Sequence, residues 1–117
     1  MLIFAHRGAS GIEPENTLRA IRAALDANVD GIEVDIHQVG DNLMAIHDRW
    51  LHRTTSGSGQ IQQYTFDELR LLDAGKGEVI PSLEEVISLI AGKCKLNLEL
   101  KSIHAIDILY DALDDAV

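Results

Sequence analysis

Ionisable side chains interrupt four short apolar stretches of the chain, and each stretch has the composition of a β-strand. These side chains come in four groups: His6-Arg7, Glu33 with Asp35, His47-Asp48, and Glu99 with Lys101. Burying such groups inside a hydrophobic run costs free energy unless they are paired or bind a metal. Because the same residue types recur in all four places, we expect one shared chemical site.

The order of the predicted elements favours an α/β fold. Apolar spacing predicts strands over residues 2–5, 31–37, 43–46 and 95–101, and helices over 16–27, 65–72, 82–92 and 103–113. Strands that alternate with helices indicate parallel pairing in an α/β sheet or barrel. The charged groups fall at the C-terminal ends of the strands, where such folds place their sites.

One connection departs from the parallel pattern. The turn formers Gly40, Asp41 and Asn42 separate the second and third strands, and a parallel crossover needs about a dozen residues or more, so a hairpin is expected there. Side chains alternate along residues 31–37, which puts Glu33 and Asp35 on one face of the strand. The hairpin would fold His47 back towards these two carboxylates.

Composition limits the partners. The chain has 117 residues, enough for one modest domain, and a formal net charge of −9. Such a balance argues against nucleic acid and anionic membranes, which both require a basic face. No apolar run reaches the roughly 18 residues of a membrane span, and the first residues do not have the pattern of a secretion signal. We therefore expect a cytoplasmic protein that acts on a small molecule.

The carboxylates suggest a metal centre. Glu33, Asp35 and Glu99 are hard oxygen ligands, which suit Mg²⁺ or Ca²⁺ better than zinc. An alternative is that Glu33 and Asp35 belong to a solvent-facing strand edge and that Glu99 forms a surface pair with Lys101. The ordered combination with two histidines at strand ends favours the metal centre.

Proton transfer and anion binding can be assigned to the remaining groups. His6 and His47 could be a general acid and base, because imidazole changes charge near neutral pH; a structural role is the alternative for each. Arg7 offers a planar fork for phosphate oxygens, and Lys101 a point charge. Arg53 could be a second phosphate clamp or a solvated loop residue. The other histidines, which lack such neighbours and are expected at the surface or in packing, are His37, His52 and His104.

Seven motifs follow one another along the chain: HRG (6–8), PENT (14–17), ExD (33–35), HD (47–48), RTTSGSG (53–59), LDAGKGEVIPSLEEV (72–86) and LNLELK (96–101). With these motifs the sequence resembles the glycerophosphodiester phosphodiesterase family. Each motif is common by itself, but their order and approximate spacing agree from Leu2 to Lys101, which makes the combination specific.

The resemblance implies a TIM-barrel phosphodiesterase that depends on a divalent cation, Mg²⁺ or Ca²⁺. It would hydrolyse glycerophosphodiesters to an alcohol and glycerol 3-phosphate. By the same match, His6 and His47 take the acid and base roles, and Arg7 and Lys101 contact the phosphate. The metal ligands would be Glu33, Asp35 and Glu99. Which histidine is the acid, and whether the attacking group is water or a hydroxyl of the substrate, stay open.

A complete barrel of this kind has eight strands and about 250 residues. Residues 1–117 supply the first three βα units and the hairpin, so we expect a single domain, incomplete at its C-terminus, whose barrel one chain does not close. Either the chain is a fragment of a longer enzyme, or copies complete the fold as a homo-oligomer. The alternative function is a non-catalytic or inactive fragment that binds metal, phosphate or a partner chain. The intact set of histidines and carboxylates favours the enzyme.

Overall fold

The computed structural model describes residues 2–102 and 106–114 of the chain. Its strands are β1 (Phe4–His6), β2 (Gly31–Val39), β3 (Asn42–Ala45) and β4 (Lys95–Ser102). Its helices are α1 (Leu18–Asp26), the 3-10 turn η1 (Ile61–Gln63), α2 (Phe66–Leu69), α3 (Leu83–Ile90) and α4 (Ile106–Asp114). The predicted order of strands and helices is confirmed. The first residues of the last predicted helix, with His104, lie outside the described residues.

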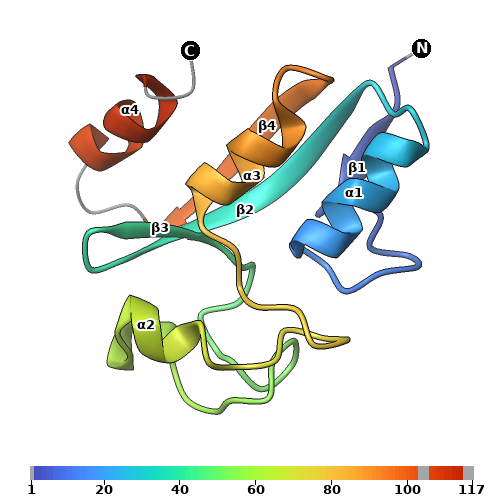
Figure 1. Ribbon diagram of the computed structural model, residues 1–117. Coiled ribbons are helices and arrows are strands. Elements are labelled where there is room, and N and C mark those ends of the chain that lie inside the picture. Colours follow the sequence, from blue (N-terminus) through green and yellow to red (C-terminus); the bar gives the residue numbers. More distant parts are fainter. Residues whose placement is uncertain (1, 103–105, 115–117) are drawn as a thin grey trace.

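Strand β2 is the centre of the sheet (Figure 1). It pairs in parallel with β1 at its start and with β4 along residues 31–37. Its end pairs antiparallel with β3, so the predicted hairpin is confirmed, and Gly40 in the turn has a φ of +60°. Since β4 occupies one edge of β2 throughout, β1 and β3 share the other edge.

The helices cover one face of the sheet. Ile32, Val34 and Ile36 on β2 are fully buried, and Figure 1 shows α1 and α3 lying side by side across β2. Each fully buried side chain of this size contributes about 1.5–3 kcal/mol of hydrophobic stabilisation. The other residues of this main core are Ile21, Ala24, Leu43, Ala45, Leu83, Val86, Ile90 and Leu109. The opposite face of β2 is left to the ionisable residues.

Side-chain caps fix where the helices begin. Thr17 caps α1 by accepting a hydrogen bond from the amide of Ala20. Capping boxes formed by Thr65 with Glu68 and by Ser82 with Glu85 open α2 and α3. These caps satisfy backbone donors that a helix start leaves free.

Residues 46–80 leave the sheet after β3 and fold around a second, smaller core, which contains α2 (Figure 1). Its buried residues are Val39, Met44, Ile46, Leu51, Ile61, Leu69, Ala74 and Ile80. The sequence predicted only a polar loop and a short helix in this region. The second core supports the backbone that carries His47 and Arg53.

The sheet is open. Within residues 2–102 and 106–114, no strand pairs with the outer edge of β1 or of β4. Ile3 is 59% exposed beside the edge of β1, and Leu100 is 44% exposed on β4. Over the same residues, none of the helices has the length and apolar character needed to span a bilayer. The structure is thus an α/β layer with two free sheet edges.

Candidate active site

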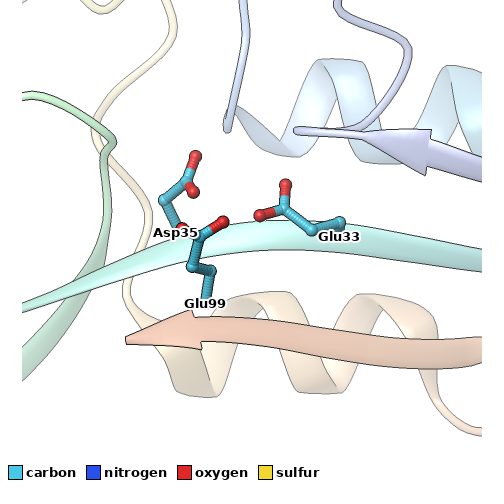
Figure 2. Close-up of side chains that lie close together, drawn as sticks. All are labelled: Glu33, Asp35 and Glu99. Carbon is cyan, nitrogen blue, oxygen red and sulfur yellow. The ribbon is translucent and has the colours of Figure 1, made fainter. Parts of the chain in front are cut away.

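The parallel register of β2 and β4 brings three carboxylates together. Asp35 pairs with Glu99 across the strands, and Glu33 lies on the same face of β2. One oxygen from each of the three lies within 4.8 Å of the others, and Figure 2 shows the carboxyl groups pointing towards one another. Glu33 is 8% exposed and Asp35 is fully buried. A solvent-facing strand edge is therefore the wrong interpretation for these two residues.

The cluster has the properties of a cation site. Glu33 Oε2 and Asp35 Oδ1 are buried and accept no hydrogen bond within the described part of the chain, and an unsatisfied buried acceptor costs about 1–3 kcal/mol or more when charged. Burial, and next to it the charge of Asp35, raise the pKa of Glu33 to about 7. An all-oxygen donor set of this kind fits a hard divalent cation, which would offset both penalties.

Asn16 holds Asp35 in place. Its Nδ2 donates to Asp35 Oδ2 at 3.0 Å, and the Asp35 amide donates to Asn16 Oδ1 at 3.2 Å. Asn16 is 2% exposed and has a φ of 58°. No role in the site was predicted for Asn16 from the sequence. Its place in the PENT motif was the available signal of a function in the site.

The turn after β1 brings Arg7 against the same carboxylates. The Arg7 amide donates to the Glu33 carbonyl at 2.7 Å, and Arg7 Nε lies 3.1 Å from Asp35 Oδ2. The next residue, Gly8, has a φ of +77°, and a Cβ there would lie 2.8 Å from the carbonyl carbon of Ala20. Only glycine lets this turn approach α1 so closely. His6 Nε2 is 3.8 Å from Glu33 Oε1, and the His6 side chain is 64% exposed.

A β-bulge directs Lys101 to the cluster. The pairing passes from Ile36 with Leu100 to His37 with Ser102, so Lys101 is an extra residue. Its Nζ lies 2.7 Å from Glu99 Oε1 and 3.9 Å from Asp35 Oδ1. This contact raises the pKa of Lys101 and lowers that of Glu99. Bulges of this kind commonly re-aim side chains beside active sites.

His47 is held by a chain of ionic contacts. Its Nδ1 lies 2.6 Å from Asp48 Oδ1, and Arg53 donates to Asp48 Oδ2 at 2.7 Å. Arg53 also donates to both oxygens of Glu15, at 2.8 and 2.9 Å, and Glu15 accepts from Arg7 at 3.2 Å. Arg53, and after it His47, lower the pKa of Asp48. Arg53 is thus an exposed loop residue, as one alternative expected, and not a free phosphate clamp, because two carboxylates occupy its guanidinium.

The other histidines are not part of the cluster. His37 is buried, with Nδ1 at 2.7 Å from Ser102 Oγ and Nε2 at 2.9 Å from the carbonyl of His47, which confirms the expected packing role. Burial lowers the pKa of His37, and His52 is exposed. Within the described ranges, His47 makes no direct contact with the three carboxylates. The contacts through Asp48, Arg53, Glu15 and Arg7 connect it to them.

Comparisons with known proteins agree with this arrangement. The model of the glycerophosphoryl diester phosphodiesterase family matches residues 6–117. A glycerophosphodiester phosphodiesterase of Caldanaerobacter subterraneus subsp. tengcongensis is 44% identical over 110 residues, which cover 86% of this chain and 45% of the relative. The chain therefore belongs to the glycerophosphodiester phosphodiesterase family.

Solved structures give the same result for the fold. A phosphodiesterase of Oleispira antarctica, in complex with the product sn-glycerol 3-phosphate, superposes with a TM-score of 0.93 at 35% identity. A glycerophosphodiester phosphodiesterase of Agrobacterium tumefaciens superposes with a TM-score of 0.92 at 32% identity. Each match covers 99% of this chain and 53% of the other. The chain thus spans about half the length of the relatives that it matches.

Proposed function

We propose that this chain carries the N-terminal part of a metal-dependent phosphodiesterase that converts glycerophosphodiesters to an alcohol and glycerol 3-phosphate. The observation that carries the proposal is the convergence of Glu33, Asp35 and Glu99 beside Arg7 and Lys101. Two buried oxygens of this cluster accept no hydrogen bond from the residues that the structure describes. The family membership and the product bound to the Oleispira antarctica phosphodiesterase support the same reaction.

In this proposal Glu33, Asp35 and Glu99 hold Mg²⁺ or Ca²⁺. When bound, the cation would offset negative charge on the phosphodiester and on the pentacoordinate transition state. Arg7 and Lys101 would bind phosphate oxygens. The side chains of Arg7 and Lys101 both lie beside Asp35. Their positive charges are therefore close to the place where the phosphate would gain negative charge in the transition state.

His6 and His47 would move the protons. The carboxylate of Asp48 accepts from Nδ1–H of His47, which leaves Nε2 of that ring for the reacting group. His6 lies next to Glu33. One imidazole would take the proton from the attacking oxygen, of water or of a substrate hydroxyl, and the other would protonate the alcohol that leaves. If the substrate hydroxyl attacks, water would then open the resulting cyclic phosphate, with the two imidazoles in reversed roles, to give glycerol 3-phosphate.

Further strands would complete the fold. In a closed barrel every strand pairs with a strand on each side. Among the described residues, β1 and β4 each have one unpaired edge, with exposed apolar side chains beside it. We propose a partial TIM barrel, completed by more of the same polypeptide or by a second copy. Size-exclusion chromatography with light scattering tests the second case. A folded monomer at micromolar concentration would contradict completion by a second copy.

Release of glycerol 3-phosphate from glycerophosphocholine tests the activity. We expect product in the presence of Mg²⁺ or Ca²⁺, and its loss with a chelator and recovery when the metal is restored. The control variant is Glu84→Gln, which removes a carboxylate from α3, away from the proposed metal ligands, and should keep the metal-dependent activity. Binding of metal without any turnover would instead favour the non-catalytic alternative.

A further inference from the structure

We propose that the hollow between residues 49–62 and the ends of β2 and β4 is the subsite for the alcohol half of the substrate, and that Arg49 makes it select polyhydroxylated alcohols over cationic ones. This inference rests on the proposed phosphodiesterase function and names the substrate class that the same site would take.

The hollow has a volume of about 200 Å³. It is lined by His37, Arg49, Gln60, Gln62 and Ser102. Because one water molecule occupies about 30 Å³ in the liquid, the space would hold about six waters, which is the size of a small polyol. Among the residues that the structure describes, every side chain lining the hollow is polar, and none is a carboxylate.

Two contacts fix the hollow next to the proposed reaction centre. The buried His37 ring, which lines it, bonds to the backbone carbonyl of His47 at 2.9 Å. Ser102, which also lines it, directly follows Lys101 in the bulge and lies 2.7 Å from the other nitrogen of the His37 ring. A phosphodiester bound by Lys101 would therefore have one of its two alcohol groups within reach of the hollow.

Of the described residues that line the hollow, Arg49 alone carries a charge that is fixed at neutral pH. Within residues 2–102 and 106–114 its guanidinium makes no hydrogen bond and no ion pair with a carboxylate, although the chain has 19 acidic residues and 10 basic ones. By contrast, the nearby Arg53 is saturated by Asp48 and Glu15. An arginine without a partner beside a polar hollow has five donors to offer a ligand.

This lining determines which alcohol fits. Arg49 and the Gln60 amide can bond several hydroxyl groups at once, and Gln62 Oε1 can accept from a further one. Gln62 Nε2 already donates to the Gln38 carbonyl at 3.2 Å and to Ser102 Oγ at 3.4 Å. A quaternary ammonium group offers no donor or acceptor, and the unpaired guanidinium would repel it. A site built to hydrogen-bond hydroxyls discriminates strongly against ligands that lack them, because its polar groups are then left unpaired.

The test compares binding and hydrolysis of two probes, glycerophosphoinositol and glycerophosphocholine, by the unchanged chain and by Arg49→Gln. Titration calorimetry gives both dissociation constants, and release of glycerol 3-phosphate gives both kcat/KM values. Arg22→Gln is the matched control, because Arg22 is also exposed and lies on α1, on the helix-covered side of the sheet.

We expect the unchanged chain to bind the inositol diester more tightly, and Arg49→Gln to weaken that binding by about tenfold, the loss of one charged hydrogen bond. Binding of the choline diester should be unchanged or tighter in the same variant, and Arg22→Gln should change neither. An equal loss for both probes, or no change for either, would overturn the subsite. Absence of turnover with both probes would count against the phosphodiesterase function alone, since the calorimetry still measures the selectivity.

Discussion

Nδ1 of His47 lies 2.6 Å from Oδ1 of Asp48, and the other oxygen of that carboxylate accepts from Arg53 at 2.7 Å. Asp48 thus fixes the ring orientation and the tautomer of His47, while Arg53 fixes Asp48. Residues that orient a functional histidine in this way typically contribute 10–100-fold to activity. Asp48 and Arg53 are therefore positioning residues in the proposed mechanism.

The Arg53 contact can be tested by graded substitution. We expect Arg53→Met to lower kcat by about 10–100-fold with a smaller change in KM, because the residue acts through His47 and does not touch the substrate. Arg53→Lys, which keeps the charge but loses the fork, should recover part of the loss. Steady-state kinetics measures both variants. A rise in KM with kcat unchanged would instead indicate that Arg53 binds the substrate.

The proposed acid and base roles of His6 and His47 can be tested by substitution. His6→Ala and His47→Ala should each lower kcat by about 10²–10⁴-fold, the usual contribution of a general acid or base. His52→Ala is the control, since His52 is exposed. Circular dichroism would verify that the variants fold. Activity within a few-fold of the unchanged chain in either variant would remove that histidine from the mechanism.

Asn16 should affect metal binding although it is not a proposed ligand. In Asn16→Ala, Asp35 loses the donor to its Oδ2 and the acceptor for its amide. We expect metal affinity to fall by about 10–100-fold and the free energy of unfolding to fall by about 1–3 kcal/mol. Asn42→Ala, at an exposed position of β3, should alter neither. Titration calorimetry with Mg²⁺ and chemical denaturation provide the two measurements.

The raised pKa of Glu33 predicts how stability depends on pH without metal. The carboxyl ionises near its ordinary value of 4.5 in the unfolded chain but only at about 7 in the folded one. Between these values the folded state binds more protons, so this group's contribution to stability falls as the pH rises from about 4.5 to 7 and is constant above. The total effect is at most about 3 kcal/mol.

Glu33→Gln should remove that dependence. With a chelator present, the difference in unfolding free energy between the variant and the unchanged chain should grow in favour of the variant up to about pH 7 and then level off. Denaturant titrations at several pH values measure it. A difference that does not vary with pH would mean that Glu33 ionises normally in the folded chain.

The turn at Gly8 gives a prediction about stability alone. Gly8→Ala would place a methyl group 2.8 Å from the backbone of Ala20 at a φ of +77°, so we expect a loss of about 2 kcal/mol or more. Gly11→Ala lies in the same loop and has no atom within 4 Å of the added Cβ, so it should be nearly neutral. Thermal denaturation compares the two, and equal effects would contradict the close approach of the turn to α1.

Much of the architecture follows from local patterns. The alternation along β2 and the turn at Gly40 each depend on residues close in sequence, and these predictions are confirmed. The capping boxes that open α2 and α3 are equally local. The meeting of Asp35 with Glu99 was also predictable, because both lie near the C-terminal ends of strands that a parallel sheet aligns.

Other features depend on contacts between distant segments and carry no local signal. The ion pairs of Arg53 with Glu15 join residues that are 38 positions apart. The bulge at Lys101 is visible only from the pairing of β4 with β2. In the second core, Leu51, Ile61, Ala74 and Ile80 are single apolar residues from stretches without helical or strand periodicity.

Because of this second core, the proposed catalytic residues are supported by two separate parts of the structure. The three carboxylates lie on strands β2 and β4, which pack on the main core. His47, by contrast, follows Ile46, whose side chain is buried in the second, smaller core. A substitution that destabilises the smaller core, for example Leu51→Ala, should therefore affect His47 but not the carboxylates. The variant would still bind the metal cation, whereas proton transfer by His47 would be lost. In this family member, inactivation by mild heat or denaturant is expected to precede the melting of the sheet.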